Sequence, residues 1–159
     1  VVLTKSALTE RVTNRRRAEI ANEARANLML RLHADSEGPS GFTIYHPRQA
    51  GTVDGVTGPS AAVIQASERA ARVFHRAMVA KLGPALADNG IRGDEQTLIG
   101  GKQGALTGSI YSKVPAILVE MVNLARPSDA QWIKESAHQK ILAEALLAGI
   151  EAVADSATR

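Results

Sequence analysis

Two residues of the sequence, His33 and Glu120, have side chains that together can carry out metal-assisted hydrolysis. His33 follows the apolar run 28–32, and Glu120 follows the apolar run 116–119. A strand that is buried on both faces normally ends in turn-forming residues and not in a titratable side chain. A hydrolytic zinc site needs neutral imidazole nitrogens that hold the ion and a carboxylate that accepts the proton of the attacking water. We therefore interpret the pair as a candidate metal ligand and a candidate general base at one edge of a sheet.

Each of the two residues also has a structural interpretation. A single histidine at the end of a strand is more often structural than a metal ligand. A glutamate in the same place more often caps a helix or forms an ion pair than catalyses a reaction. The occurrence of both after buried strands favours the functional interpretation without deciding it.

The sequence lacks the motifs of several other catalytic classes. It has no cysteine, so disulfides, thiolate catalysis and cysteine-based zinc sites are excluded. It has no His-Glu-x-x-His helix and no Gly-x-Ser-x-Gly turn, which disfavours zincin peptidases and serine hydrolases. The glycines at 100, 101 and 104 lack the lysine and hydroxyl residues of a phosphate loop, and we interpret them as a flexible turn.

The remaining histidines are weaker candidates for a metal site. His46 ends the strand-like segment 42–46 and is the best substitute ligand among them. His75 and His138 fall within predicted helices. We expect His75 to lie on the surface or pack within its helix, and His138 to face solvent.

The formal net charge of +3 comes mainly from arginines near the N-terminus. Nucleic-acid binding would require aromatic side chains among these arginines, but the two Phe, two Tyr and one Trp all lie elsewhere. We interpret the arginine-rich stretch 11–25 as the solvated face of a helix and predict no nucleic-acid partner. No apolar run reaches the roughly 18 residues needed to cross a bilayer, so we also predict no membrane-spanning segment.

Strands and long helices are predicted to alternate along the chain. Apolar and β-branched runs predict strands at 1–4, 28–32, 42–46 and 115–119, with weaker signals at 97–99 and 110–111. Helical spacing and capping residues predict helices over about 6–26 (cap Ser6 or Thr9), 60–82 (cap Ser60) and 128–153 (cap Ser128 or Asp129). Glycine and proline predict a long loop at 48–60 and a stop at Asn89-Gly90. This order predicts an α/β fold with a central, mostly parallel sheet and helices on both faces.

Three segments resemble the zinc-dependent N-acetylmuramoyl-L-alanine amidases. Residues 17–36 read Arg-x-x-x-Ala-Asn-x-x-x-Ala-Asn-Leu-Met-Leu-Arg-Leu-His-Ala-Asp-Ser, similar to the family's Arg-xxx-Ala-Asn helix and its Ser-x-His-Ala-Asn type strand. Residues 115–120 read Pro-Ala-Ile-Leu-Val-Glu, close to the family's Pro-Ala-x-Leu-Val-Glu strand. The opening Val2-Leu3-Thr4 is similar to the family's Val-x-Leu-Thr-Arg strand. The resemblance extends from the start of the chain to about Asn123.

The resemblance implies a zinc amidase fold of the phosphorylase/hydrolase-like kind and gives catalytic-site roles to two residues. It places His33 on a zinc ligand and Glu120 on the catalytic glutamate, the general base on zinc-bound water. The family's other His and Glu ligands would precede Val1, so we expect residues 1–159 to be one amidase catalytic domain that lacks its N-terminal segment. The chain departs from the family pattern at Arg31, at Asp35, and after Glu120, where the usual glycine and aromatic residue are missing.

The resemblance also implies a substrate and a compartment. The expected reaction is hydrolysis of the amide between N-acetylmuramic acid and L-alanine in peptidoglycan, outside the cytoplasm in the periplasm, in the cell wall or after secretion. A protein regulator is compatible with this function, and the segments 48–60 and 92–109 are candidate walls of a substrate groove. The alternative is an amidase-like module that binds peptidoglycan or a protein without hydrolysis, and a zinc peptidase on a related sheet is a third, weaker option.

Overall fold

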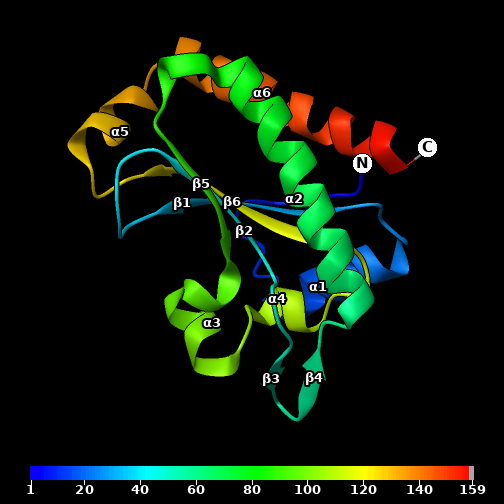
Figure 1. The fold of residues 1–159 in the computed structure, drawn as a ribbon. Coiled ribbons are helices and arrows are strands. Elements are labelled where there is room, and N and C mark those ends of the chain that lie inside the picture. The colour runs from blue at the N-terminus through cyan, green and yellow to red at the C-terminus, as the bar shows by residue number, and fades with distance from the viewer. Residues whose placement is uncertain (158–159) are drawn as a thin grey trace. The chain divides into compact units, whose positions relative to one another are not determined.

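A four-stranded sheet carries both candidate residues. The computed structural model describes residues 1–157, and Figure 1 shows their fold. The strands lie in the order β1 (Met29–Asp35), β6 (Ala116–Asn123), β2 (Phe42–His46) and β5 (Asp88–Gly93). Apolar and β-branched side chains fill their interiors, and Ile44, Ile117 and Val119 are fully buried. The apolar runs that precede His33 and Glu120 in the sequence therefore form the interior of the sheet.

The strand directions make the sheet mixed and mostly parallel. The backbone N–H of Met29 donates to Pro115 O (2.8 Å) and that of Leu124 donates to Asp35 O (2.8 Å), so β1 and β6 run in the same direction. Strand β2 runs antiparallel to β6, with Thr43 opposite Glu120. The predicted α/β class, a mostly parallel sheet flanked by helices, is confirmed.

The chain divides into two compact units, each built from several segments. Unit 1 comprises residues 1–29, 46–68 and 93–117, and unit 2 comprises residues 30–45, 69–92 and 118–159 as far as they are described. Our expectation of a single domain over 1–159 stays a prediction.

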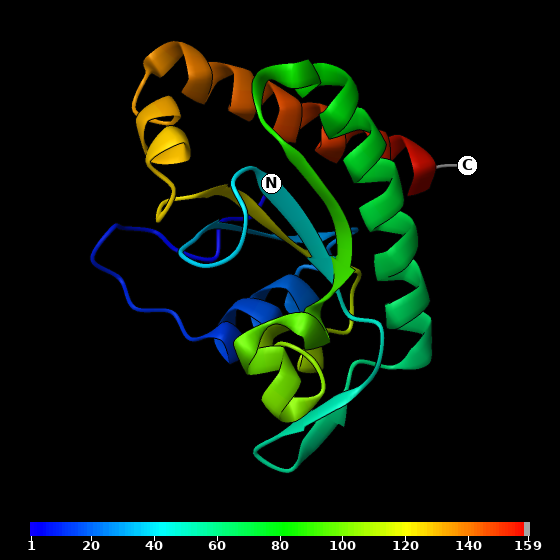
Figure 2. The same ribbon diagram turned by 60° about the vertical axis from the view of Figure 1, so that its left-hand side comes forward.

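Unit 2 contains most of the sheet and two long helical segments. Helix α6 (Ser136–Ala157) packs closely on the C-terminal half of α2 (Ala61–Leu82), as Figure 2 shows. The contact is tight because Gly149 has no side chain: a Cβ there would lie 2.7 Å from the ring of the fully buried Phe74. The short helix α5 (Pro127–Trp132) follows β6.

Unit 1 is built from short elements around small residues. It contains α1 (Asn14–Glu23), the hairpin β3 (Gly51–Val53) and β4 (Val56–Gly58), α3 (Leu98–Gln103) and α4 (Thr107–Ile110). Its core includes Ala18, Ala21, Met29 and Ala116. The small side chains let α1 approach the loop before β6 closely, and the Asn22 side chain fixes this contact through Tyr111 O (2.9 Å) and Lys113 N (2.8 Å).

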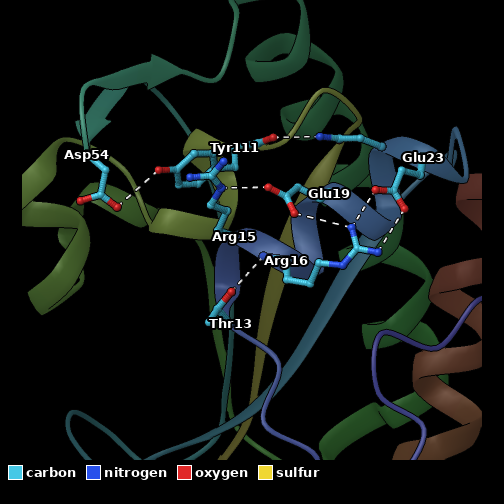
Figure 3. Close-up of polar contacts among 8 residues, drawn as sticks. Thr13, Arg15, Arg16, Glu19, Glu23, Asp54 and Tyr111 are labelled. Carbon is cyan, nitrogen blue, oxygen red and sulfur yellow. Dashed lines mark hydrogen bonds and ion pairs between the residues drawn. The ribbon is translucent and has the colours of Figure 1, made fainter.

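Arg15 and Arg16 of α1 lie on a solvated helix face, as predicted, whereas Arg17 is half-buried and binds the Thr4 hydroxyl. Arg15 pairs with Glu19 (2.8 Å) and Arg16 pairs with Glu23 (2.7 Å), as Figure 3 shows. Both arginine side chains are about half exposed, at 58% and 48%. Arg15 also lies over the ring of Tyr111, 5.1 Å from its centre. Much of the positive charge of this helix is therefore paired on its own surface.

Several predicted element boundaries are wrong. Residues 1–4 form no strand, and α1 is capped by Thr13 and not by Ser6 or Thr9. The Thr13 hydroxyl accepts a hydrogen bond from Arg16 N (3.1 Å), which satisfies a backbone donor that the earlier candidates lie too far upstream to reach. By contrast, Ser60 caps α2 as predicted.

The glycine-rich middle of the chain is helical where weak strands were predicted. Residues 97–99 lead into α3, because the Thr97 hydroxyl accepts from Gly100 N (3.0 Å) and starts a helix despite the β-branched sequence. Residue 110 ends α4, Asn89-Gly90 lies inside β5, and the loop 48–60 contains the β3–β4 hairpin. The predicted helix 128–153 is two helices, α5 and α6, and neither Ser128 nor Asp129 caps α6.

Within residues 1–157, no helix combines the length and the apolar character that crossing a membrane requires.

Candidate functional site

His33 and Glu120 lie next to each other on neighbouring strands of unit 2. The His33 Nδ1 and Glu120 Oε1 atoms are 3.9 Å apart. Contrary to our prediction, neither residue ends its strand, because β1 continues to Asp35 and β6 continues to Asn123. The two side chains therefore project from the face of the sheet, near its end, and the backbone hydrogen bonds of the flanking residues hold their positions.

Glu120 has an environment that is unusual for a carboxylate. Its side chain is only 15% exposed, and its Oε2 atom is buried without a hydrogen-bond partner among the described residues. Burial and, secondarily, the charge of Asp35 raise the pKa of Glu120 to about 7, and the nearby Arg31 opposes this rise. At neutral pH the group is thus near the midpoint of its titration and can both accept and donate a proton.

His33 is more exposed than Glu120 and lies between two charged residues on β1. Side chains alternate along a strand, so Arg31, His33 and Asp35 project from the same face. The His33 side chain is 53% exposed, whereas Arg31 is buried at 9%. The Oδ1 atom of Asp35 accepts hydrogen bonds from Ser36 N (2.7 Å) and Glu37 N (2.9 Å), which hold this carboxylate near Glu120.

Tyr45, which lies near Glu120, and Arg92, which contacts Tyr45, were not identified from the sequence. Burial raises the pKa of the half-buried Tyr45, and Asp35 and Glu120 add to the rise, while Arg92 opposes it through charge and hydrogen bonding. The alternation of Thr43 and Tyr45 along β2 could have indicated Tyr45. Arg92 lies in a glycine-containing segment with no clear strand signal, so no pattern pointed to it.

The remaining histidines have structural environments. Burial lowers the pKa of His46, and its Nδ1 atom lies 3.0 Å from Pro47 O. His75 Nε2 pairs with Asp88 Oδ1 (2.9 Å), in agreement with the structural role expected for it. The prediction that His138 faces solvent is wrong, because its ring stacks on Trp132 at 4.6 Å with an interplanar angle of 5°.

The described residues supply only part of a zinc site. A catalytic zinc ion is normally held by three protein ligands. No cluster of three or more His, Asp or Glu side chains that could hold a metal occurs within residues 1–157. The exposed imidazole of His33 suits one ligand position, and the unpartnered carboxylate oxygen of Glu120 suits a base. These two residues alone do not complete the ligand set.

A family model described as N-acetylmuramoyl-L-alanine amidase matches residues 1–152. The chain belongs to the N-acetylmuramoyl-L-alanine amidase family. The family assignment made from the sequence motifs is thus confirmed. These amidases are hydrolases that act on peptidoglycan and are generally zinc-dependent.

Solved structures of amidases share the fold. The catalytic domain of the amidase CwlV from Bacillus (Paenibacillus) polymyxa var. colistinus matches with a TM-score of 0.72 and 24% identity, over 97% of this chain and 72% of that one. The amidase AmiC2 of Nostoc punctiforme matches with a TM-score of 0.71 and 19% identity, over 99% and 72%. An amidase from Clostridium difficile 630 matches with a TM-score of 0.68 and 23% identity, over 91% and 67%. No curated protein sequence matches significantly.

Proposed function

We propose that this amidase hydrolyses the bond between N-acetylmuramic acid and L-alanine in peptidoglycan, with Glu120 as its general base. The observation that carries the proposal is the buried Glu120 carboxyl, with one oxygen unpartnered and a pKa of about 7, next to the exposed imidazole of His33. A base with a pKa near the working pH is the most effective one for proton transfer. Membership of the amidase family supplies the bond to be broken.

In the proposed reaction, Glu120 moves one proton between two places. Its carboxylate accepts a proton from the water that attacks the amide carbonyl, and a C–O bond forms. The same group then donates that proton to the alanine nitrogen as the C–N bond breaks, which releases the stem peptide as an amine. The raised pKa favours both steps, since the group holds the proton easily and releases it easily near neutral pH.

We assign His33 as one ligand of the zinc ion on which the family generally depends. A zinc ion in such a site supplies polarisation of the carbonyl group and lowers the pKa of bound water. The part of the chain that the structure describes supplies no further ligand cluster, so our proposal for Glu120 concerns its proton transfers only.

The proposed substrate also determines where the protein acts. Peptidoglycan lies outside the cytoplasm, so we propose an extracytoplasmic site of action, in the periplasm, in the cell wall or after secretion. The CwlD amidase from Clostridioides difficile, which matches with a TM-score of 0.65 and 16% identity, has been solved in complex with the GerS lipoprotein. We propose that a protein partner regulates this chain as well.

The test measures release of stem peptides from purified peptidoglycan together with the zinc content of the chain. We expect Glu120→Gln to lower kcat by about 10²–10⁴-fold, which is the usual contribution of a general base. Glu151→Gln, at an exposed position of α6, is the matched control and should retain full activity. Full activity of Glu120→Gln would contradict the role of Glu120. Less than about 0.1 zinc per chain with no peptide release would favour a module that binds peptidoglycan without hydrolysis.

A further inference from the structure

Tyr45 lies near Glu120 and is contacted by Arg92, but neither residue has a part in the proton transfers proposed above. Thr43 is opposite Glu120 in the β2–β6 register, and Tyr45 is opposite Leu118. Residues two apart on a strand share a face, so Tyr45 projects from the same face as Thr43 and Glu120. Arg92 comes from β5, the next strand beyond β2, and contacts the Tyr45 side chain. Thr43 and Tyr45 on β2 thus lie on the face that carries Glu120, and Arg92 reaches Tyr45 from β5.

The two side chains together present hydrogen-bond donors. Burial and nearby acids hold the pKa of Tyr45 above its usual value, so at neutral pH its hydroxyl is protonated and can donate. Arg92 is partly exposed, and no acidic residue in the described part of the chain forms an ion pair with it. A guanidinium beside a phenol hydroxyl matches the two oxygens of a carboxylate.

An anionic ligand could bind near Tyr45 only if Arg92 offset the negative charges of the neighbouring acids. Asp35 and Glu120 both lie close enough to Tyr45 to disfavour its negatively charged form. They would repel an incoming carboxylate in the same way. Arg92 opposes them at the Tyr45 hydroxyl, while Arg31 is buried on the far side of Glu120, on β1.

We propose that Tyr45 and Arg92 form a subsite that binds a free carboxylate of the stem peptide. This inference rests on the proposed function, because it takes the scissile amide to lie at Glu120. The glycan part of the substrate has neutral amides and hydroxyl groups, and the lactyl acid is itself consumed in the amide bond. The carboxylates therefore lie on the peptide side, and the peptide extends from Glu120 towards β5.

The dimensions agree with the nearest carboxylate, that of the residue after L-alanine. Strands β6 and β5 are separated by two inter-strand spacings, about 10 Å. The Arg92 side chain reaches back towards Tyr45 and shortens this distance. Two extended residues span about 7 Å. The carboxylate of the second residue beyond the scissile bond can thus reach the Tyr45–Arg92 pair.

Two probes that differ in one group test the subsite. They are muramoyl-L-alanyl-D-glutamate with a free α-carboxylate and the same compound with an α-carboxamide. We expect the wild-type chain to prefer the carboxylate probe by about 10- to 100-fold in kcat/KM, mainly through KM. Arg92→Gln should abolish this preference, Arg92→Lys should retain part of it, and Tyr45→Phe should weaken it. Arg76→Gln, at an exposed position of α2, is the control and should leave the preference unchanged.

Binding measured by calorimetry on the same chain separates the subsite from catalysis. If the wild type binds the carboxylate probe more tightly, and Arg92→Gln loses that difference, the subsite is supported even when no turnover occurs, and only the proposed hydrolysis fails. Equal affinity and equal turnover for the two probes in the wild type would overturn the subsite, and so would absence of binding and turnover for both. An unchanged preference in Arg92→Gln would overturn it as well.

Discussion

Two carboxyl groups of unit 2, the half-buried Glu120 and the buried Asp129, have opposite environments. The Oε2 atom of Glu120 has no hydrogen-bond partner in the described chain. The carboxylate of Asp129 accepts hydrogen bonds from Gly41 N (2.8 Å), Asn123 N (3.0 Å) and the hydroxyl groups of Ser40 and Ser128. Burial raises the pKa of Glu120 to about 7, whereas at Asp129 the donors outweigh burial and the pKa is lowered.

The difference shows that burial alone does not mark a carboxylate as reactive. Burial disfavours the charged form of both groups, and the number of donors decides the outcome. By accepting these hydrogen bonds, Asp129 joins the loop before β2 to the turn after β6. The Asn123 side chain adds to this connection, because it donates to Glu37 O (2.8 Å) and Pro39 O (3.1 Å). We therefore interpret Asp129 as structural and Glu120 as the group available for chemistry.

The largest effect expected from this comparison is the loss of stability in Asp129→Ala. The substitution leaves the backbone N–H groups of Gly41 and Asn123 buried without an acceptor, and each unpaired group costs about 1–3 kcal/mol. We expect the free energy of unfolding at pH 7 to fall by about 4 kcal/mol, measured by urea denaturation. Asp129→Asn keeps one acceptor oxygen and should lose clearly less. A change below about 1 kcal/mol in Asp129→Ala would contradict the structural role.

Asp129→Ala is expected to destabilise the fold, whereas removal of the carboxylate at position 120 is expected to stabilise it at neutral and higher pH. In metal-free protein the folded state holds a proton on Glu120 up to a pKa of about 7, compared with 4.5 for an ordinary glutamate. The stability from this proton is fully present below pH 4.5 and is lost as the pH rises through about 7. The loss corresponds to about 3 kcal/mol, and Glu120→Gln should not suffer it.

The measurement compares urea denaturation of wild type and Glu120→Gln at pH 4.5 and pH 8, in the presence of a chelator. The difference in unfolding free energy should move in favour of the variant by about 3 kcal/mol between these pH values. Asp129 has the opposite sign, since its lowered pKa stabilises the fold above the ordinary value and that stability is lost in acid. A pH-independent difference for Glu120→Gln would show that Glu120 titrates normally.

The sequence predicted the pairing of His33 with Glu120 better than it predicted their surroundings. Both follow apolar runs within recognisable motifs, and parallel neighbouring strands bring them together. It did not show that the strands continue past them, because Ala34 and Met121 carry no clear stop or continuation signal. Arg92 was missed because its strand contains Asn89 and Gly90, which typically form turns. The donors to Asp129 come from distant segments, and no local pattern shows such contacts.

The smallest expected effect concerns the charge next to Glu120. Asp35 is the second cause of the raised pKa of Glu120, after burial, so Asp35→Asn should lower that pKa, but by less than burial raises it. Asparagine retains an acceptor for Ser36 N and Glu37 N, so the local turn should persist. The carboxyl carbon of Glu120 in metal-free protein, followed by NMR titration, reports the change directly. The control Glu37→Gln removes an exposed acid from the same turn and should leave the titration in place. If Asp35→Asn raised the pKa or left it unchanged, the charge of Asp35 would have no part in the reactivity of Glu120, and burial without donors would be its sole cause.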